Sequence, residues 1–359
     1  MVPRWKVRLL GTLLVSVLIL GTVKFLSQRD LDLKFFAQAS EPKPCSKKEA
    51  LRLSVYQVLF EYGIQVDWIS GDSLSKTVRI PKDLAIVEPY TALVGRFKEE
   101  GGQLLRADSN PEGDVAVIEV GVQNEPLFAL TLRKDSELNR VAGSIALIVR
   151  ELHRANDALL EEFMSLDAQI GLAAFPGLNH TREVTSMAAE SQHEVVVQIP
   201  FETTNGKVGD EYRLESNMTV KEIRKRVRRG IASVQGVVSV YIHIGGEANL
   251  DGALLEAILD ETGKAELSLL VEREGPPDDC TLARKKGVAC GVVHTFLDTI
   301  KEAPFIRQQL LHLAELASRE GRAIGVCSAE DLTLRVLKNE LPKLHKKGFK
   351  FVKLSEVVN

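Results

Sequence analysis

The sequence predicts an α/β protein built from three parts: an N-terminal membrane segment, a small α+β domain and a larger (β/α) barrel. Three observations support this division. A basic stretch followed by an apolar run opens the chain, helix-like segments and a hairpin pattern come next, and from residue 144 onward strand-like and helix-like segments alternate. We expect the three parts at residues 1–26, 45–138 and 144–359, with residues 27–44 as a linker.

The composition is that of an ordinary globular protein. The 359 residues are 45% hydrophobic and 26% charged with a formal net charge of −3, so there is neither a disorder signature nor a global basic excess. The basic run KEIRKRVRR spaces Ile223 and Val227 four residues apart, which indicates the solvated face of an amphipathic helix. We therefore expect no nucleic-acid partner.

The N-terminus is typical of a membrane segment. The basic stretch MVPRWKVR precedes an uncharged apolar run of roughly 15 residues, Leu9 to Val23, and this order keeps the positive end in the cytoplasm. A signal peptide cleaved near the small residues AQAS is the alternative, but charged residues separate that site from the apolar run. We expect residues 1–26 to act as an uncleaved signal anchor in the inner membrane, with the folded parts in the periplasm.

Residues 45–138 combine helical and strand-like patterns. Apolar residues recur at helical spacing in 47–63 and again in 85–102, and each stretch closes on glycine. Alternating segments at 114–122 and 126–135, joined through QNEP, predict a β-hairpin. No catalytic pattern stands out in this small α+β domain, which is our candidate for contact with an envelope protein partner.

From Ser144 to the C-terminus the chain repeats a strand-and-helix alternation. The strand-like runs are SIALIV, AQIGLAAF, HEVVVQIP, GVVSVYIHI, AELSLLV, ACGVVHTFL, RAIGVC and FKFVKL. Helical stretches separate most of them, notably 181–191, 219–234, 251–263, 303–321 and 330–348. About eight such units fit a (β/α) barrel or a deformed version of one, and a doubly wound open sheet is the alternative. In both architectures functional side chains gather at the carboxyl ends of the strands.

The residue patterns alone do not identify a catalytic reaction. The chain holds no Gly-rich phosphate loop, nucleophile elbow, HExxH helix or C-x-x-C motif. His243 stands out among the histidines because it ends an apolar strand at the expected functional end. Cys280 and Cys290 are close enough in sequence to bridge if the chain turns back between them, and buried free thiols are an equal alternative.

Several segments, in the same order, resemble the divergent polysaccharide deacetylases, a branch of the NodB-like carbohydrate deacetylases. They are IALIVREL, HEVVVQIPFE, VQGVVSVYIHIG, TFLD and RAIGVCSAEDLTLRVL. The resemblance implies a deformed (β/α) barrel of NodB-like type and metal-assisted removal of an acyl group from a sugar. That chemistry uses a divalent metal such as zinc, held by carboxylate and imidazole ligands with an open position for water.

The family's functional positions are mostly substituted in this sequence. They fall on Arg150, Glu151, Gln198, His243, Asp298, Ser328 and a position near Val271. The family has two aspartates at the first two positions and a histidine at the third, whereas the histidine at 243 and the aspartate at 298 are retained. The apolar strand bodies match well. This pattern is expected when the fold is kept and the chemistry is lost.

We therefore expect a catalytically degenerate member, a pseudoenzyme, that holds no metal or other cofactor. If Arg150 points inward, it adds a positive charge where a dication would sit. At about 4 Å and an effective dielectric near 20, that repulsion is worth roughly 4 kcal/mol for each unit of charge. The remaining cleft, with Glu151, Gln198, Glu202 and His243 near its mouth, is expected to bind a cell-wall glycan or an envelope protein.

Two other functions stay open at the level of sequence. One is an active hydrolase that removes acyl groups from an envelope polysaccharide, with Glu151 as base and His243 as acid in a rearranged site. The other is a structural scaffold of the cell envelope, in which no substitution in the cleft would matter.

Overall fold

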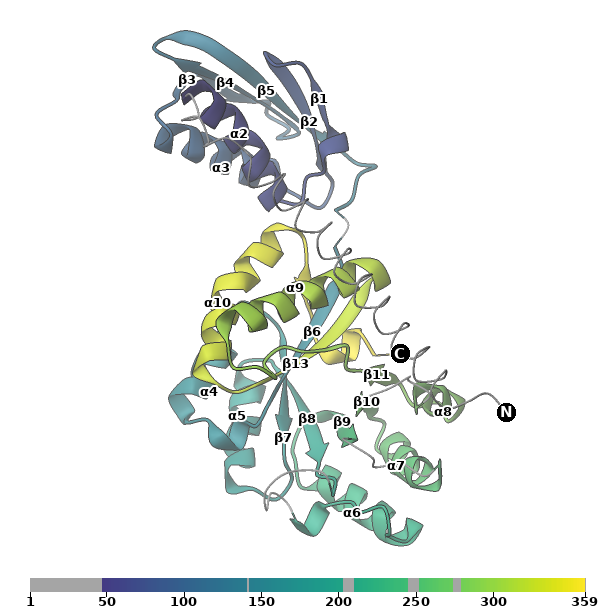
Figure 1. Cartoon of the computed structure of the whole chain (residues 1–359). Helices are drawn as coiled ribbons and strands as arrows, with labels where there is room; N and C mark the ends of the chain where they lie inside the picture. Colours follow the sequence, from purple (N-terminus) through teal and green to yellow (C-terminus); the bar gives the residue numbers. More distant parts are fainter. Residues whose placement is uncertain (1–46, 141, 203–209, 245–251, 274–278, 359) are drawn as a thin grey trace, which may run out of the picture.

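The computed structural model describes residues 47–140, 142–202, 210–244, 252–273 and 279–358. They form a small domain and a larger domain, each built around its own sheet (Figure 1). The predicted membrane segment and the linker lie outside the described residues. Within the part of the chain that is described, no helix is both long enough and apolar enough to span a bilayer.

The small domain is a five-stranded sheet with two helices packed on one face (Figure 1). Its elements are α2 (Lys47–Glu61), a short 3₁₀ helix (Val66–Trp68), β1 (Ile69–Gly71), β2 (Ser75–Pro81), α3 (Val87–Glu99), β3 (Gln103–Ser109), β4 (Val115–Val122) and β5 (Glu125–Asp135). The sheet order is β1-β2-β5-β4-β3, and the central pair β2 and β5 is parallel while the other pairs are antiparallel.

Burial in the small domain follows the periodicity of its sequence. α2 buries Leu51, Val55 and Val58 on one face, and β4 buries every second residue against the helices. The predicted hairpin of β4 and β5 is confirmed, and its turn places Gln123 and Asn124 at positive φ, as a two-residue hairpin turn requires. β3 was not predicted, because most of its side chains are exposed and leave no alternation.

The larger domain alternates strands and helices along residues 144–358. Its strands are β6 (Ser144–Arg150), β7 (Ile170–Ala174), β8 (Glu194–Ile199), β9 (Val237–Ile244), β10 (Ser268–Arg273), β11 (Cys290–Val292), β12 (Thr295–Phe296), β13 (Arg322–Ser328) and β14 (Lys350–Phe351). Its helices are α4 (Asp157–Met164), α5 (Asn179–Glu190), α6 (Val220–Ala232), α7 (Gly252–Lys264), α8 (Asp279–Lys285), α9 (Ala303–Glu320) and α10 (Asp331–Lys346). Three 3₁₀ helices lie at Leu152–Arg154, Asp210–Tyr212 and Leu354–Glu356.

The strand order identifies a curled parallel half-barrel. The order of strands across the sheet is β11, β10, β9, β8, β7, β6, β13, β12. If the order is followed from β6 to β11 and then from β12 back through β13 to β6, it repeats the order of the strands along the chain and describes one circle. A doubly wound sheet would instead reverse its order at a switch point, so that alternative is wrong. The run ACGVVHTFL, predicted as one strand, forms β11 on β10 and then β12 on β13. Among the described strand pairs β11 and β12 are not joined, and the half-barrel is open along this seam.

Side chains alternate between two apolar layers across this sheet. On β6, Ile145 and Leu147 belong to an outer cluster shared with the helices, whereas Ala146 and Ile148 belong to an inner cluster. The other members of the inner cluster include Ala173, Val196, Tyr241, Leu270, Ile324 and Val326. This alternation determines which side chains at the strand ends point into the half-barrel.

The C-terminal segment covers the amino-terminal ends of the strands. β14 pairs with the first residues of β6, and Leu354 and Val357 enter the inner cluster. Glu194, buried at the start of β8, accepts a hydrogen bond from the backbone N–H of Ser355 at 3.1 Å. The carboxyl ends, where the sequence pattern predicts functional side chains, lie at the opposite end of the sheet.

The sequence left two alternatives for Cys280 and Cys290, a bridge or buried free thiols, and the structure has the bridge. The two residues form a disulfide with their Cα atoms 5.4 Å apart, and the bond ties α8 to β11 beside the seam. Cys327 is a buried free thiol. Cys45 lies outside the described residues.

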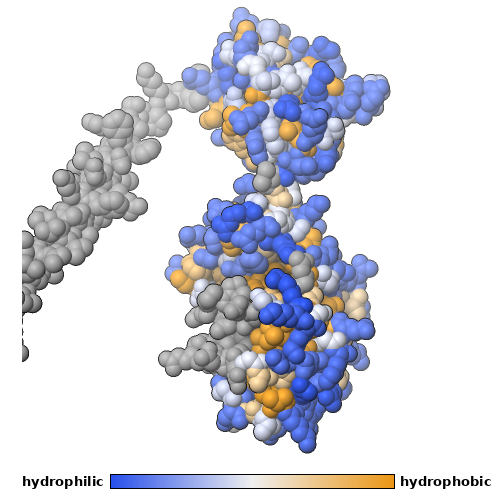
Figure 2. Space-filling view, turned by 90° about the vertical axis from the view of Figure 1, so that its right-hand side faces the viewer, coloured by the Kyte–Doolittle hydropathy of each residue, from blue (hydrophilic) through white to orange (hydrophobic). Residues whose placement is uncertain are grey.

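Arg140 links the small domain to the half-barrel. Its Nε atom lies 2.7 Å from Oδ2 of Asp83 in the small domain, and its Nη1 donates to the carbonyl oxygen of Lys346 on α10 at 2.8 Å. The Lys346 ammonium lies 5.7 Å from the ring centroid of Tyr62. The space-filling view shows the two domains as separate lobes with a narrow connection (Figure 2).

Gly143, which leads into β6, allows a test of how α9 packs on the half-barrel. A Cβ atom at this position would lie 2.1 Å from the carbonyl oxygen of Ala317. This distance is too short for a contact, so the backbone at Gly143 or at Ala317 on α9 would have to shift. We expect Gly143→Ala to lower the free energy of unfolding by about 1–3 kcal/mol, measured by urea titration with circular dichroism. Gly95→Ala in α3 is the control, because a Cβ there meets nothing within 4 Å. That change should stabilise the helix by about 0.5–1 kcal/mol; a loss of stability at Gly95 alone would contradict this account of packing.

Candidate functional site

A group of polar side chains lines the inner side of the sheet at the carboxyl ends of its strands. We call it the strand-end cluster, and its members are Arg150, Gln198, His243, Glu272 and Ser328. Each lies two residues beyond a member of the inner apolar cluster on its own strand. Because side chains of a strand alternate between its faces, each of these residues points into the half-barrel.

An ion pair lies at the centre of the strand-end cluster. Arg150 Nη1 lies 3.0 Å from Oε1 and 3.3 Å from Oε2 of Glu272. His243 Nδ1 contacts the same Oε1 atom at 2.6 Å. The guanidinium of Arg150 also lies over the ring of Phe296, 5.7 Å from its centroid. Four strands, β6, β9, β10 and β12, thus contribute to one contact network.

Burial changes the acidity of Glu272. Its side chain is 5% exposed, and the loss of hydration raises its pKa to about 7, although the charge of Arg150 acts in the opposite direction. Near neutral pH this carboxyl group is therefore balanced between its neutral and charged forms. Its hydrogen bonds and charge interaction with Arg150 favour the charged form.

Unused hydrogen-bonding capacity lies beside this network. The Oε1 atom of Gln198 and the hydroxyl of Tyr241 are buried and have no hydrogen-bond partner within the described part of the chain. The two residues are register partners on the adjacent strands β8 and β9. An unpaired buried polar group costs about 1–3 kcal/mol, so a ligand or water that reaches these atoms is stabilised there.

Asp298, retained from the family pattern, connects elements of the fold. It is 3% exposed, and its Oδ2 accepts hydrogen bonds from the backbone N–H of Ser328 at 2.8 Å and from the hydroxyl of Thr333 at 2.9 Å. These bonds join the loop after β12 to the end of β13 and to the first turn of α10. Ser328 thus meets Asp298 rather than the ion pair in the contacts described.

The two glutamates expected near a ligand have other partners. Glu151 follows β6 at a φ of 58°, and its carboxylate pairs with Arg154 at 3.2 Å. Glu202 Oε2 accepts hydrogen bonds from the backbone N–H and the hydroxyl of Ser216, each at 3.1 Å. Of the ligand-binding residues expected from the sequence, Gln198 and His243 are the ones that belong to the strand-end cluster.

Glu272 was not anticipated from the sequence. The family resemblance places an aspartate of the family near Val271. The side chain of Val271 belongs to the outer cluster and packs under the helices. One residue later the side chain faces inward, so Glu272 supplies the carboxylate at the end of β10. The alternation in SLLVER, with Leu270 facing inward, is the signal that could have identified it.

The strand-end cluster does not fit a divalent metal. Its metal-ligating side chains, His243 and Glu272, already contact each other, and the cation of Arg150 holds the carboxylate. At about 4 Å and an effective dielectric near 20, Arg150 would oppose a metal ion by roughly 4 kcal/mol per unit of ionic charge. Elsewhere among the described residues, Asp157, His180 and Glu183 bring ligand atoms within 4.8 Å of one another, on α4 and α5.

The curled parallel α/β half-barrel agrees with the deformed (β/α) barrel that the family resemblance of the sequence implies. The family model for divergent polysaccharide deacetylases matches residues 148–358. Because this match covers more than half of the chain, the protein belongs to the divergent polysaccharide deacetylase family.

Two relatives of known sequence and one solved structure are similar to this chain. The uncharacterized protein YibQ of Escherichia coli (strain K12) is 25% identical over 244 residues, which are 66% of this chain and 73% of YibQ. An uncharacterized protein of Haemophilus influenzae is 20% identical over 231 residues, or 64% of this chain and 81% of the relative. The crystal structure of the uncharacterized protein ATU2773 from Agrobacterium tumefaciens C58 matches with a TM-score of 0.55 at 22% identity, covering 60% of this chain and 89% of its own. This structural likeness supports the fold.

The pH dependence of stability tests the environment of Glu272. The folded protein keeps a proton on this carboxyl group up to about pH 7, whereas the unfolded chain releases it near the ordinary value of 4.5. The folded state therefore binds the extra proton between these values, and the free energy of unfolding falls as the pH rises through this interval. We expect Glu272→Gln to remove that part of the decline in urea titrations at several pH values. The same slope in variant and unaltered protein would disprove the raised pKa.

Proposed function

We propose that this protein is a membrane-anchored, extracytoplasmic member of its family that binds a cell-envelope glycan without hydrolysing it. The observation that carries the proposal is the ion pair between Arg150 and Glu272 at the strand ends. Metal-assisted deacetylation needs a cation with an open position for water. Here a guanidinium, which has neither ligand positions nor a bound water to activate, meets the buried carboxylate.

The rest of the strand-end cluster supports binding of a sugar. Gln198 Oε1 has unused hydrogen-bonding capacity, and the His243 side chain is 32% exposed. Hydroxyl and acetamido groups of a glycan supply matching donors and acceptors. A few polar groups placed in a largely apolar setting are typical of sites that orient a small ligand.

Two features support a location outside the cytoplasm. The N-terminal basic stretch and apolar run of the sequence favour a signal anchor with its charged end in the cytoplasm. The disulfide between Cys280 and Cys290 is a bond that persists in oxidising compartments such as the bacterial periplasm. Both features agree with a folded part that faces the cell envelope.

The small domain offers a surface for an envelope protein. On α2, Leu53 and Phe60 are 55% and 41% exposed, and the ring of Tyr56 lies 6.0 Å from that of Phe60. Their spacing places them on one face of the helix. We propose this face as the part of residues 45–138 that contacts a protein partner, because grouped exposed apolar and aromatic side chains mark interaction sites.

A rearranged hydrolase has no observation in its favour. Such an enzyme would need Glu151 as base and His243 as acid at one reacting centre. Glu151 pairs with Arg154, and the described contact of His243 at the strand ends is with Glu272.

Metal content and deacetylase activity test the loss of hydrolysis. We expect the purified full-length protein to hold no stoichiometric divalent metal, because the cation of Arg150 opposes one at the strand ends. We also expect no acetate release from chitooligosaccharides or peptidoglycan fragments, assayed alongside metal analysis by mass spectrometry. Stoichiometric zinc together with acetate release would overturn the proposal.

Calorimetry with chitooligosaccharides tests glycan binding. We expect saturable binding to the full-length protein and about tenfold weaker binding to Gln198→Ala, since a lost hydrogen bond leaves a polar group unpaired at a cost of about 1–3 kcal/mol. Gln308→Ala, an exposed position on α9, is the matched control and should bind as the unaltered protein does. Equal affinity of Gln198→Ala and the unaltered protein would show that the glycan does not bind at the strand ends. If neither protein bound a glycan, glycan binding would be ruled out and contact with an envelope protein would remain as the proposed function.

A further inference from the structure

A cavity of about 350 Å³ lies at the seam of the half-barrel, and none of its lining residues belongs to the strand-end cluster. Its walls come from α8, β11, the end of α9, the start of β13 and the C-terminal segment. Cys290 and Arg322, which line it, are the first residues of their strands, whereas the strand-end cluster lies at the opposite, carboxyl ends. The cavity is therefore separate from the candidate site described above.

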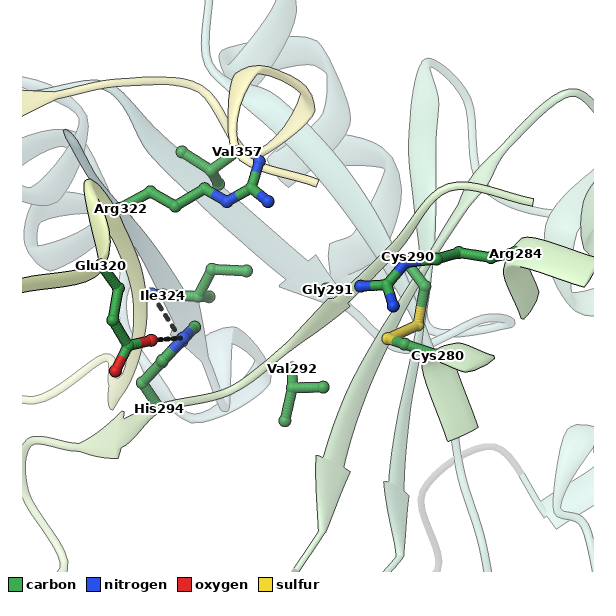
Figure 3. A pocket seen from close by; sticks show the side chains of 10 residues that line it. All are labelled: Cys280, Arg284, Cys290, Gly291, Val292, His294, Glu320, Arg322, Ile324 and Val357. Carbon is green, nitrogen blue, oxygen red and sulfur yellow. Dashed lines mark hydrogen bonds and ion pairs between the residues drawn. A yellow bond between two sulfur atoms is a disulfide. The ribbon is translucent and has the colours of Figure 1, made fainter. Parts of the chain in front are cut away.

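Positive charge faces the cavity from two sides. The side chains of Arg284, on α8, and Arg322, at the start of β13, extend toward the same space from opposite walls (Figure 3). Val292, Ile324 and Val357 supply apolar surface between them, together with the disulfide (Figure 3). Cationic walls and an apolar lining thus occur in one small space.

His294 adds a hydrogen-bond donor in a fixed orientation. Its Nδ1 accepts from the backbone N–H of Ile324 at 3.0 Å, so the proton of the neutral ring lies on Nε2. Burial lowers the pKa of His294, which favours this neutral form near pH 7. Glu320 Oε2 lies 3.8 Å from Nε2 and places one negative charge at the edge of the cavity.

We propose that this cavity binds a small organic monocarboxylate with a compact apolar body. Guanidinium groups bind carboxylate oxygens with pairs of hydrogen bonds, and Arg284 brings one such group to the cavity. Arg322 adds positive charge on the opposite wall. The apolar side chains and the disulfide leave surface that an inorganic anion would not cover. The carboxylate of Glu320 opposes a doubly charged ligand such as phosphate. The volume agrees with this class, since pockets for small ligands measure about 300–1,000 Å³.

Methyl NMR of the full-length protein, with benzoate as the probe, tests this site. We expect saturable shifts of the methyl signals of Ile324 and Val357, and about tenfold weaker binding of benzamide, which has the same shape without the charge. Arg284→Gln should weaken benzoate about tenfold, because a hydrogen bond to a charged partner is lost. Lys285→Gln, which removes a charge from the same helix outside the cavity lining, is the matched control and should leave the affinity unchanged.

The unaltered protein supplies a second readout that does not depend on a variant. Benzoate affinity should fall as the ionic strength rises, because charge attraction is screened by salt. Benzamide binding as tightly as benzoate, wild-type affinity in Arg284→Gln, or affinity independent of salt would each overturn the proposal. Inorganic phosphate that competes as well as a second carboxylate would overturn the assignment of an apolar ligand body.

Discussion

A carboxylate inside an apolar half-barrel needs a counter-charge, and the arrangement at the strand ends depends on how Glu272 obtains one. Glu272 is the last but one residue of β10 and Arg150 is the last of β6, and three strands, β7, β8 and β9, lie between them in the sheet. In a flat sheet the two backbones would be about 19 Å apart, given a spacing of about 4.8 Å per strand. Their contact at 3.0 Å is a contact across the interior, which requires a curled sheet and the long side chain of arginine.

The same pair supports the proposal that this chain keeps the fold without the family's metal chemistry. The inner apolar cluster beneath the strand ends and the C-terminal segment at their other end hold the sheet in its curved form. The guanidinium of Arg150 neutralises the carboxylate of Glu272, which could otherwise bind a metal ion. Glu272 therefore has its counter-charge within the protein. Asp298 is retained from the family pattern, and its role in this structure is to connect elements of the fold. Its hydrogen bonds join the loop after β12 to β13 and α10.

Much of the architecture could be predicted because it rests on periodicity. The apolar runs of β6 to β9 and the helical stretches that became α5 and α6 follow local rules and are present in the structure. β3 and the split of one predicted run into β11 and β12 could not be predicted, since both depend on which strand lies next to them. At the candidate site the family resemblance placed Arg150, Gln198 and His243 at strand ends, but it left open whether Arg150 points inward; the alternation of inner and outer side chains in the structure decides this. The pairing of Arg150 with Glu272 could not be predicted, because it joins residues 122 positions apart through the curvature of the sheet.

A double-mutant cycle between Arg150 and Glu272 tests the central claim most directly. The free energy of unfolding is measured for the unaltered protein, Arg150→Met, Glu272→Gln and the double variant. Removing one member of a buried pair leaves the other unsatisfied, whereas removing both does not. The account predicts that the double variant loses less stability than the sum of the single variants, by about 1–3 kcal/mol. Losses that add to within about 0.5 kcal/mol would contradict it, because the two side chains would then act independently.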